Sequence, residues 1–390
     1  MRKIVGAIVL AATYLIAASS VWASGDTNLL FRNATRTLER IQDATASGDR
    51  AAVEMQSKLI IQMGTDLKNA KQSDLQDARN LRAVAIYLFS GGNPNVAERQ
   101  LIPLKVDPEN KALLDGALAY ARGDKAGAIK FLENVDLASL PPTLAGRVAL
   151  VKAILTSAED LKAALSLLGT ARALMPGTLV EEGALRRCIS FAGKLPDIEE
   201  LEHCASAYIR RFPKSIYWKE FEESFTLSLI EMDYLKAGGT MPQLNIILKD
   251  LPPADTRKML LMISKAAVGH GRHLLATSSA QSAGELSRAG SAEMARSNLY
   301  EGAIMIVGEG YESGKAKLER IDAALLDSSD RLLLEKALEL SRQIAQRPDT
   351  AKEEAIKPQT SAGLERDQPP AYVSLLARAK TALADPDPTK

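Results

Sequence analysis

A helix-start signal that recurs at a near-constant interval constrains the fold of this chain most. Asp124, Asp160 and Asp197 each stand before a run with helical apolar spacing, at intervals of 36 and 37 residues. Asp and Asn cap helices because their side chains accept hydrogen bonds from the free N–H groups of the first turn. Asn93 marks an earlier copy, and Gly48-Asp49 marks a weaker first one. Self-similarity at such a period is typical of stacked repeat proteins.

Prolines mark where each of these helices ends. Pro141, Pro176 and Pro213 stand 16 or 17 residues after the three aspartates. Pro108 stands 15 residues after Asn93. Because proline cannot continue a helix, the chain turns there into a second helix. One repeat is therefore predicted to be a helix hairpin of roughly 35 residues, close to the tetratricopeptide length.

Apolar side chains within the predicted helices recur at steps of three and four, the spacing of one helix face. Three such stripes are Ile198, Leu201, Ala205, Tyr208, Ile209, Phe212; Leu161, Ala164, Leu165, Leu168, Ala171; and Trp218, Phe221, Phe225, Leu229. A single hairpin cannot bury both faces, so the pairs must stack. Aromatic residues are only 5% of the chain, and long alternating β-type runs are missing. We therefore predict an all-α fold, a tetratricopeptide-like stack of helix hairpins (an α-solenoid).

The rhythm weakens after Ala237, so we assign 24–237 to the repeat region and 238–346 to a C-terminal helical region. Within the latter we expect long helices over 254–276 and 284–308, joined by a polar loop over 277–284. A last hairpin is expected to bury these residues: Leu318, Ile321, Leu325 on one helix and Leu333, Ala337, Leu340, Ile344 on the next.

The segment 347–390 is polar and rich in proline. Such a composition cannot offset the entropy of ordering a packed core, so we predict a disordered tail. A short helix around 371–384 is expected to interrupt it.

The first 23 residues have the pattern of a secretory signal peptide. Met1-Arg2-Lys3 is basic, Ile4–Ala18 is uncharged and apolar, and Val21-Trp22-Ala23 offers the small residues of a cleavage site. We expect residues 1–23 to be removed on export and the mature protein to be periplasmic. A retained N-terminal anchor is the alternative, although a run of roughly 15 residues falls short of the ~20 that span a bilayer.

The charge balance gives no support for a nucleic-acid or lipid partner. The whole chain carries a net charge of +1. Loss of Arg2 and Lys3 with the leader would bring the net charge to −1. A near-zero balance creates no field that collects nucleic acid or an anionic membrane surface.

The two cysteines, Cys188 and Cys204, lie about seven and nine residues from a bend near Leu195-Pro196. Antiparallel helices on either side of that bend could bring them level, and an oxidising compartment would allow a disulfide. Such a bond would be worth roughly 3 kcal/mol. The alternative is two buried thiols that never meet, since Cys also behaves as a small apolar residue.

Three histidines offer little chemistry. His270 and His273 have the i, i+3 spacing of a metal pair, but no carboxylate or Cys nearby completes the three or four ligands that zinc needs. His203 and Cys204 are adjacent, and adjacent helical residues point in different directions. We expect solvated histidines here, with no metal and no cofactor.

Two acidic pairs and two glycine-rich pieces also have ordinary explanations. Glu181-Glu182 and Glu222-Glu223 are expected to lie on solvated helix faces. Gly308-Glu309-Gly310 fits no phosphate-binding loop, and Gly91-Gly92 ends a helix before Asn93 or Pro94 opens the next. Since no catalytic constellation stands out, we expect a protein that is not an enzyme.

Several short segments of the sequence resemble the MotC family, motility proteins of alphaproteobacteria related to rhizobia. They are Leu38-Glu39-Arg40-Ile41-Gln42-Asp43, the turn at 48–52, and above all the stretch from Asp77-Ala78-Arg79-Asn80 to Ser90-Gly91-Gly92-Asn93-Pro94. The likeness is best over 29–130 and continues weakly through 208–215.

The resemblance implies a periplasmic accessory of the flagellar motor that binds the periplasmic part of the stator protein MotB and supports rotation. It implies no catalytic or binding residue that could be transferred. We expect no small-molecule substrate, and contact with the membrane only through the motor. Tyr217, Trp218 and Phe221 are tempting contacts for a partner, but we expect them to belong to the core between repeats.

Two other classes remain open from the residues. One is a general cell-envelope adaptor built from helical repeats. The other is a cell-wall hydrolase with a helical accessory region, which would need carboxylates or a nucleophile that the sequence does not reveal.

Overall fold

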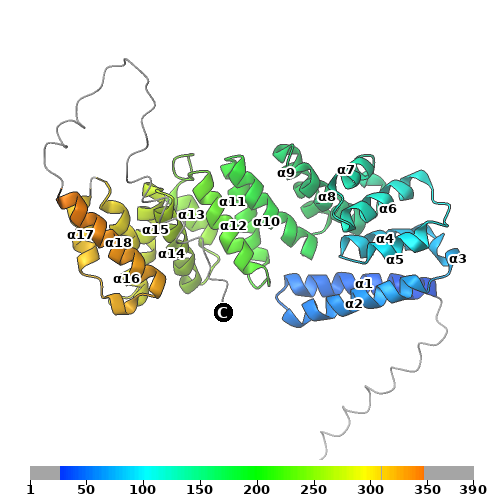
Figure 1. The fold of residues 1–390 in the computed structure, drawn as a ribbon, viewed down its shortest axis with the longest axis horizontal. Helices are drawn as coiled ribbons and strands as arrows, with labels where there is room; N and C mark the ends of the chain where they lie inside the picture. The colour runs from blue at the N-terminus through cyan, green and yellow to red at the C-terminus, as the bar shows by residue number, and fades with distance from the viewer. Residues whose placement is uncertain (1–26, 309, 347–390) are drawn as a thin grey trace, which may run out of the picture. The chain divides into compact units, whose positions relative to one another are not determined.

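A computed structural model describes residues 27–308 and 310–346 (Figure 1). Every regular element in these residues is a helix, which confirms the predicted all-α class. The predicted leader, 1–23, and the predicted tail, 347–390, lie outside the described residues.

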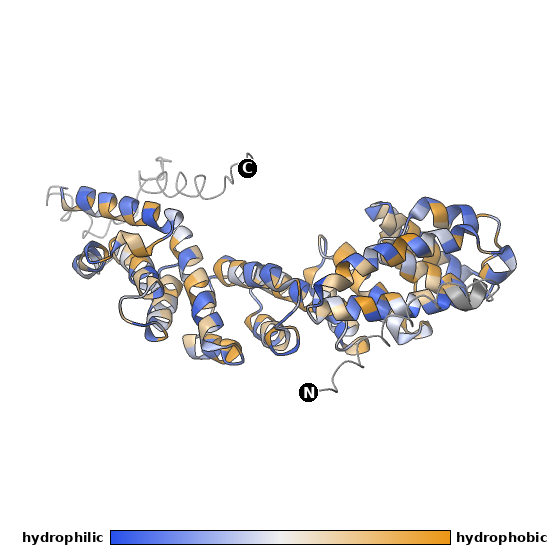
Figure 2. Ribbon diagram, turned by 90° about the horizontal axis from the view of Figure 1, so that it is seen from below, coloured by the Kyte–Doolittle hydropathy of each residue, from blue (hydrophilic) through white to orange (hydrophobic). Residues whose placement is uncertain are grey.

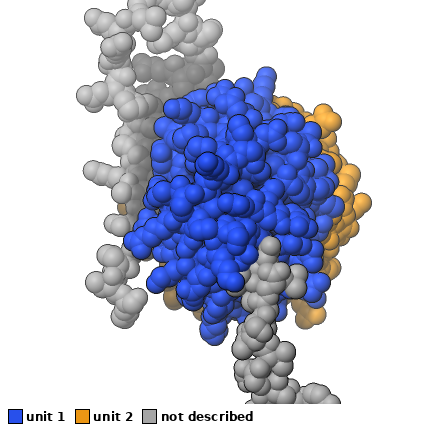
Figure 3. Space-filling model, turned by 90° about the vertical axis from the view of Figure 1, so that its right-hand side faces the viewer, with its two compact units in different colours: residues 1–184, 214–216 blue, residues 185–213, 217–390 orange. Residues whose placement is uncertain are grey.

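The described residues form two compact units, which Figure 3 shows in different colours. The first holds residues up to 184 together with 214–216, and the second holds 185–213 and the residues from 217 onward. The division falls inside α10 (Leu179–Lys194). The boundary that the sequence predicts at residue 237 is a different one, and it stays a prediction.

The helices of the first unit follow one another with short connections. They are α1 (Thr27–Ala46), α2 (Arg50–Lys68), α3 (Gln72–Leu75), α4 (Ala78–Phe89), α5 (Pro94–Leu101), α6 (Pro108–Ala121), α7 (Lys125–Leu132), the 3₁₀ turn Leu137–Ser139, α8 (Pro142–Thr156) and α9 (Leu161–Leu174).

After α10, the second unit continues in the same way. Its helices are α11 (Ile198–Arg211), α12 (Trp218–Glu231), α13 (Met241–Leu248), α14 (Pro253–Gly269), α15 (His273–Glu285), α16 (Ala292–Met305), α17 (Tyr311–Glu319), the 3₁₀ turn Ala323–Leu325 and α18 (Ser328–Ala345).

Within each unit, consecutive helices pair as hairpins and the hairpins stack. In the first unit α6 packs on α7 and α8 on α9, and the first helices of successive hairpins also touch, as α4 does with α6. In the second unit α14 pairs with α15 and α16 with α17, while α12, α14, α16 and α18 contact one another in sequence. The predicted stack of helix hairpins is thus confirmed.

The predicted capping residues occupy the positions assigned to them. Asp49, Asn93, Asp124, Asp160 and Asp197 are the N-caps of α2, α5, α7, α9 and α11, and each accepts a hydrogen bond from a backbone N–H of the first turn. The 36-residue period therefore marks the second helix of each hairpin.

Two of the four prolines follow a helix end closely, as predicted, whereas the other two lie at the start of the next helix. Pro108 is the first residue of α6, and Pro141 is the N-cap of α8. Pro176 and Pro213 lie in the connections after α9 and α11. All four therefore lie where one hairpin ends and the next begins.

First and second helices of a hairpin are buried differently. The first helix α8 buries residues on every side, including the polar Arg147, whereas the second helix α9 buries only Ala164, Leu168 and Ala171. Figure 2 shows hydrophilic and hydrophobic residues alternating along many helices, as expected where one stripe faces a neighbour. The first helices are enclosed because they contact both their own partner and the adjacent hairpins.

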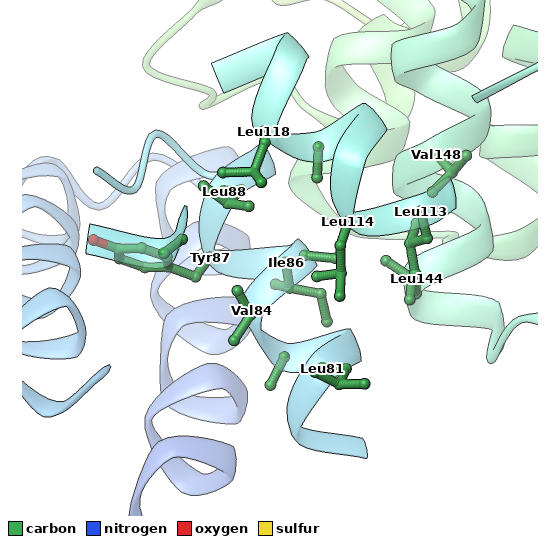
Figure 4. Close-up of a cluster of buried hydrophobic side chains, with 14 of the residues drawn as sticks. Leu81, Val84, Ile86, Tyr87, Leu88, Leu113, Leu114, Leu118, Leu144 and Val148 are labelled. Carbon is green, nitrogen blue, oxygen red and sulfur yellow. The ribbon is translucent and has the colours of Figure 1, made fainter. Parts of the chain in front are cut away.

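The core of the first unit gathers around α4, α6 and α8. Figure 4 shows Leu81, Val84, Ile86, Tyr87 and Leu88 of α4 beside side chains from α6 and α8. Tyr87 is 1% exposed, and its hydroxyl accepts a hydrogen bond from the Asn93 backbone N–H at 2.8 Å. A Cβ atom added at Gly92 would lie 2.5 Å from the Tyr87 ring, so only glycine fits beneath it.

The same seven-residue turn occurs once in each unit. Tyr87-Leu-Phe-Ser-Gly-Gly-Asn93 ends α4, and Tyr234-Leu-Lys-Ala-Gly-Gly-Thr240 precedes α13, 147 residues later. This interval is close to four repeats. Each tyrosine carbonyl accepts the N–H of the second glycine at 2.9 Å, and Gly91 and Gly238 both have positive φ. This turn of the first unit is thus repeated across residue 237.

The predicted polar loop over 277–284 is wrong, because these residues lie inside α15. The chain instead breaks at Gly271, whose φ is +65°, and again between α15 and α16. Small residues allow α15 to approach its neighbours closely. Ser264 Oγ donates to the Ala276 carbonyl at 2.8 Å, and Ser297 Oγ donates to the Ala280 carbonyl at 2.7 Å. The Ser- and Ala-rich composition that resembles a loop is thus a close-packed helix surface.

The last predicted hairpin is partly wrong in its buried residues. Leu318 is buried on α17, but Ile321 and Leu325 lie beyond the end of that helix. On α18 the buried stripe is Asp330, Leu334, Ala337 and Ser341. Leu333, Leu340 and Ile344 are only half-buried beside it. The observed stripe shares Ala337 with the predicted one, and it includes a buried aspartate that apolar spacing did not predict.

Candidate functional site

The two cysteines come together on neighbouring helices of the second unit. Cys188 on α10 and Cys204 on α11 have Cα atoms 6.3 Å apart, and the structure places their sulfur atoms at bonding distance, 2.00 Å. Both side chains are fully buried. The bond would close a loop of 16 residues and would be worth roughly 3 kcal/mol.

A third group lies against the two sulfurs. Glu200 Oε1 is 3.2 Å from Cys188 Sγ and 3.3 Å from Cys204 Sγ. Glu200 stands three residues after the N-cap Asp197, the position from which a glutamate ordinarily reaches back to the cap N–H. In the described residues, Cys188, Glu200 and Cys204 are the one set of three metal-ligating side chains close enough to share an ion.

The structure does not bring the histidines into a site. His270 ends α14, with its Nδ1 2.9 Å from the Ala266 carbonyl oxygen, and His273 begins α15 after the break at Gly271. The i, i+3 relation therefore does not place both rings on one helix face. His203 is exposed on α11 while its neighbour Cys204 is buried.

The three aromatic residues considered as partner contacts, Tyr217, Trp218 and Phe221, all lie in the second unit. Phe221 is fully buried and stacks on Tyr208 with ring centres 4.3 Å apart, and Trp218 lies 4.9 Å from Phe221. The Arg186 guanidinium lies over the Tyr217 ring at 4.5 Å. The expectation that Phe221 belongs to the core between helices is confirmed, while Tyr217 and Trp218 are half-buried at its edge.

The sequence led us to expect the acidic pairs on solvated helix faces, and this prediction is wrong for three of the four residues. Glu181 and Glu182 are buried, and Glu182 accepts a hydrogen bond from Ser215 Oγ at 3.2 Å. Glu222 is also buried and binds Lys258 Nζ at 2.8 Å. Only Glu223 is exposed. These glutamates lie on first helices, where the enclosure of all sides buries polar positions as well.

A buried charge cluster joins α1 to α8 and α10 in the first unit. Arg147 lies 3.8 Å from Glu39, and Asp43 accepts the Leu179 backbone N–H at 3.2 Å. Burial raises the pKa of Glu39 and of Asp43, and burial lowers the pKa of Arg147. Perturbed carboxyls of this kind can mark a catalytic site. Here each is tied to a cation or a helix end and joins helices.

A second buried cluster joins α14, α16 and α18 in the second unit. Asp330 is 1% exposed and accepts a hydrogen bond from Tyr300 Oη at 2.9 Å. Lys265 Nζ and Arg296 Nε lie 2.8 and 3.1 Å from its oxygens. Burial and the nearby Asp330 raise the pKa of Tyr300 far above its ordinary range. Apolar spacing could not reveal this cluster, but an aspartate on the predicted buried face was a usable signal.

Among the described helices, none is long and apolar enough to cross a membrane.

Comparison with known proteins connects this fold to motility. A family model described as "Chemotaxis protein MotC" matches residues 1–388. The chain is also 28% identical over 332 residues to the chemotaxis protein MotC of Rhizobium meliloti (strain 1021), covering 84% of this chain and 75% of that relative. No solved structure matches the chain. Since the family model extends over nearly the whole sequence, the chain belongs to the MotC family of chemotaxis proteins.

Proposed function

We propose that this protein is a non-enzymatic scaffold of the flagellar motor that works in the periplasm. It binds the periplasmic part of the stator protein MotB and is needed for flagellar rotation. The observation that carries the proposal is the family match, because it extends over residues 1–388 and so includes both helical units. Stacked helix hairpins support it, since they present extended surfaces suited to a partner's helix or peptide.

The leader supports export. Its basic start and apolar run have the pattern of a cleavable signal. Cell fractionation with N-terminal sequencing of the exported protein should find a new start near residue 24. A variant lacking residues 2–23 should stay in the cytoplasm. Full-length protein in the cytoplasm with its leader intact would contradict the localisation.

Direct binding tests the partner. The purified protein without residues 1–23 should be retained on an immobilised MotB periplasmic domain at micromolar concentration. A heat-unfolded sample of the same protein and an unrelated exported helical protein serve as controls. Absence of retention above these controls would contradict stator binding.

The behaviour of a deletion strain separates the motor from a general envelope role. We expect intact flagella without swimming, restored by the wild-type gene. Lost or shortened flagella together with envelope defects would favour the general adaptor instead. Degradation of peptidoglycan by the purified protein would favour the hydrolase, and we expect none.

A further inference from the structure

We propose that Cys188, Cys204 and Glu200 form a site for one thiophilic cation such as zinc once the disulfide is reduced. The bond and the cation are then alternative links between α10 and α11. The site is independent of the stator-binding proposal, because it lies in the interior of one hairpin.

The position of the Glu200 carboxylate carries this inference. Its Oε1 atom is almost equally far from the two sulfurs, at 3.2 and 3.3 Å. The sulfurs of a disulfide have no proton to donate to that oxygen, whereas two thiols or a shared cation would attract it. Three donor atoms around one point are the arrangement that a metal ion requires.

The donor set suits zinc. Zinc binds thiolate sulfur at about 2.3 Å and carboxylate oxygen at about 2.0–2.2 Å, in tetrahedral geometry. Tetrahedral angles at these lengths separate sulfur from oxygen by about 3.6 Å, close to the distances observed. The two sulfurs must move apart to about 3.8 Å, which rotation of their side chains can supply while the Cα atoms stay 6.3 Å apart.

The local structure holds the ligands firmly. Glu200 and Cys204 are one helical turn apart on α11, and Cys188 faces them from α10. Both cysteines are fully buried while Glu200 is half-buried, so a cation and a water as fourth ligand can enter from the glutamate side. Asp197 fixes the first turn by accepting the Glu200 N–H at 3.1 Å.

The chemistry balances in two steps. A phosphine reductant gives two electrons to the disulfide and becomes a phosphine oxide, and two protons from water complete the thiols. Binding of Zn²⁺ then forms two zinc–sulfur bonds and releases both thiol protons, because only the thiolate is a ligand.

Metal titration of the whole purified chain tests the site. After phosphine reduction and removal of the reductant, Zn²⁺ should bind with a stoichiometry of one in competition with a chromophoric chelator, releasing two protons. Co²⁺ should give the sulfur-to-metal absorption of a thiolate complex. The unreduced chain should bind neither ion with this signature.

Variants locate the ligands. Cys188→Ser with Cys204→Ser should abolish binding, and Glu200→Gln should weaken it by at least about tenfold. Glu199→Gln is the matched control, because it removes the same charge from the same turn at an exposed position. His270→Ala with His273→Ala should leave binding unchanged. Circular dichroism establishes that each reduced variant is folded.

Two results would overturn the proposal. One is a folded, reduced chain that takes up no stoichiometric Zn²⁺ at micromolar concentration. The other is equal affinity in the Glu200→Gln and Glu199→Gln variants, which would leave the carboxylate outside the site.

Discussion

The two units contain the same Tyr-Leu-x-x-Gly-Gly turn but support it differently. Tyr87 lies within α4, and its hydroxyl accepts a backbone hydrogen bond from Asn93. Tyr234 lies beyond the end of α12, and its hydroxyl donates to the Glu202 carboxylate at 2.6 Å. α12 ends earlier because Asp233 adopts a positive φ of 50° and pairs with Arg272. The motif therefore fixes the glycine turn, while the surroundings decide where the helix stops.

The units also differ in how they accommodate buried charge. In the first unit Arg147 is 3.8 Å from Glu39, and burial raises the pKa of both nearby carboxyls. In the second unit Asp330 has two cations within 3.1 Å and a tyrosine hydroxyl as well. Removing a buried carboxylate that is paired with cations is strongly destabilising, because the cations stay buried without a partner. A carboxyl whose pKa is raised can instead take up a proton when its cation is removed. The second cluster should therefore be the more sensitive to substitution.

The largest expected effect is at Asp330. Asp330→Ala should lower the free energy of unfolding by about 3–5 kcal/mol, because it leaves Lys265 and Arg296 beside an empty, buried position. Arg147→Met should cost less, about 1–3 kcal/mol, since Glu39 and Asp43 can become neutral. Urea unfolding of the whole chain measures both.

Lys336→Ala, at an exposed pair with Glu339, is the surface control for this comparison and should change stability by less than about 1 kcal/mol. Equal losses for Asp330→Ala and Arg147→Met would contradict the ranking of the two clusters.

Alanine at the second glycine of each turn should cost about 1–3 kcal/mol. The new Cβ atom would meet the Tyr87 ring at 2.5 Å in Gly92→Ala and the Tyr234 ring at 2.4 Å in Gly239→Ala. Similar losses at both sites would establish that the two turns are equivalent. Thermal melts of the two variants make the comparison.

The control for the glycine variants is Gly169→Ala on α9, where no atom lies within 4 Å of the new Cβ. It should stabilise the chain by about 0.5–1 kcal/mol, because alanine favours helix. A loss at this position would show that glycine replacement is harmful for reasons other than the tyrosine ring.

Removal of each tyrosine hydroxyl should lower the stability by a different amount in the two turns. Tyr234→Phe breaks a hydrogen bond to a carboxylate and should cost about 1.5–3 kcal/mol. Tyr87→Phe breaks a bond from a backbone N–H and should cost about 0.5–1.5 kcal/mol. Unfolding in denaturant measures both, and a larger loss for Tyr87→Phe would reverse the distinction drawn here.

The smallest expected effects concern the pH dependence of stability, which should have opposite signs for Glu39 and Asp43 on one side and Asp327 on the other. Burial holds the pKa of Glu39 and Asp43 above their ordinary values of 4.5 and 3.8, so the folded state binds protons more tightly. Their contribution to stability grows as pH falls through the raised pKa values. The Asp330 backbone N–H holds the pKa of Asp327 below its ordinary 3.8. The contribution of Asp327 is present above that pH and is lost as pH falls through the lowered pKa.

Melting temperatures between pH 3 and pH 7 test these signs. Glu39→Gln with Asp43→Asn should remove the stability that these two carboxyls contribute at low pH. Asp327→Asn should remove the loss of stability that protonation of Asp327 causes at low pH. Parallel pH profiles for the two variants and the wild-type chain would contradict both assignments.

The amino-acid sequence by itself determined the helices and their ends in most of the chain. Asp and Asn caps and the following prolines act through neighbouring backbone groups, so Asp124, Asp160 and Asp197 could be read without tertiary information. The sequence also indicated that antiparallel helices could bring Cys188 and Cys204 side by side. This could be predicted because the number of residues from the bend sets the position of each cysteine along its helix.

Only the tertiary structure decided which helices are enclosed on all sides. This depends on contacts among residues far apart in sequence, so Glu182 and Asp330 are buried where local pattern predicted solvent or an apolar neighbour. The same contacts made α15 a helix despite its loop-like composition, because serines on α14 and α16 bind its backbone. They also brought the Glu200 carboxylate to the two sulfurs.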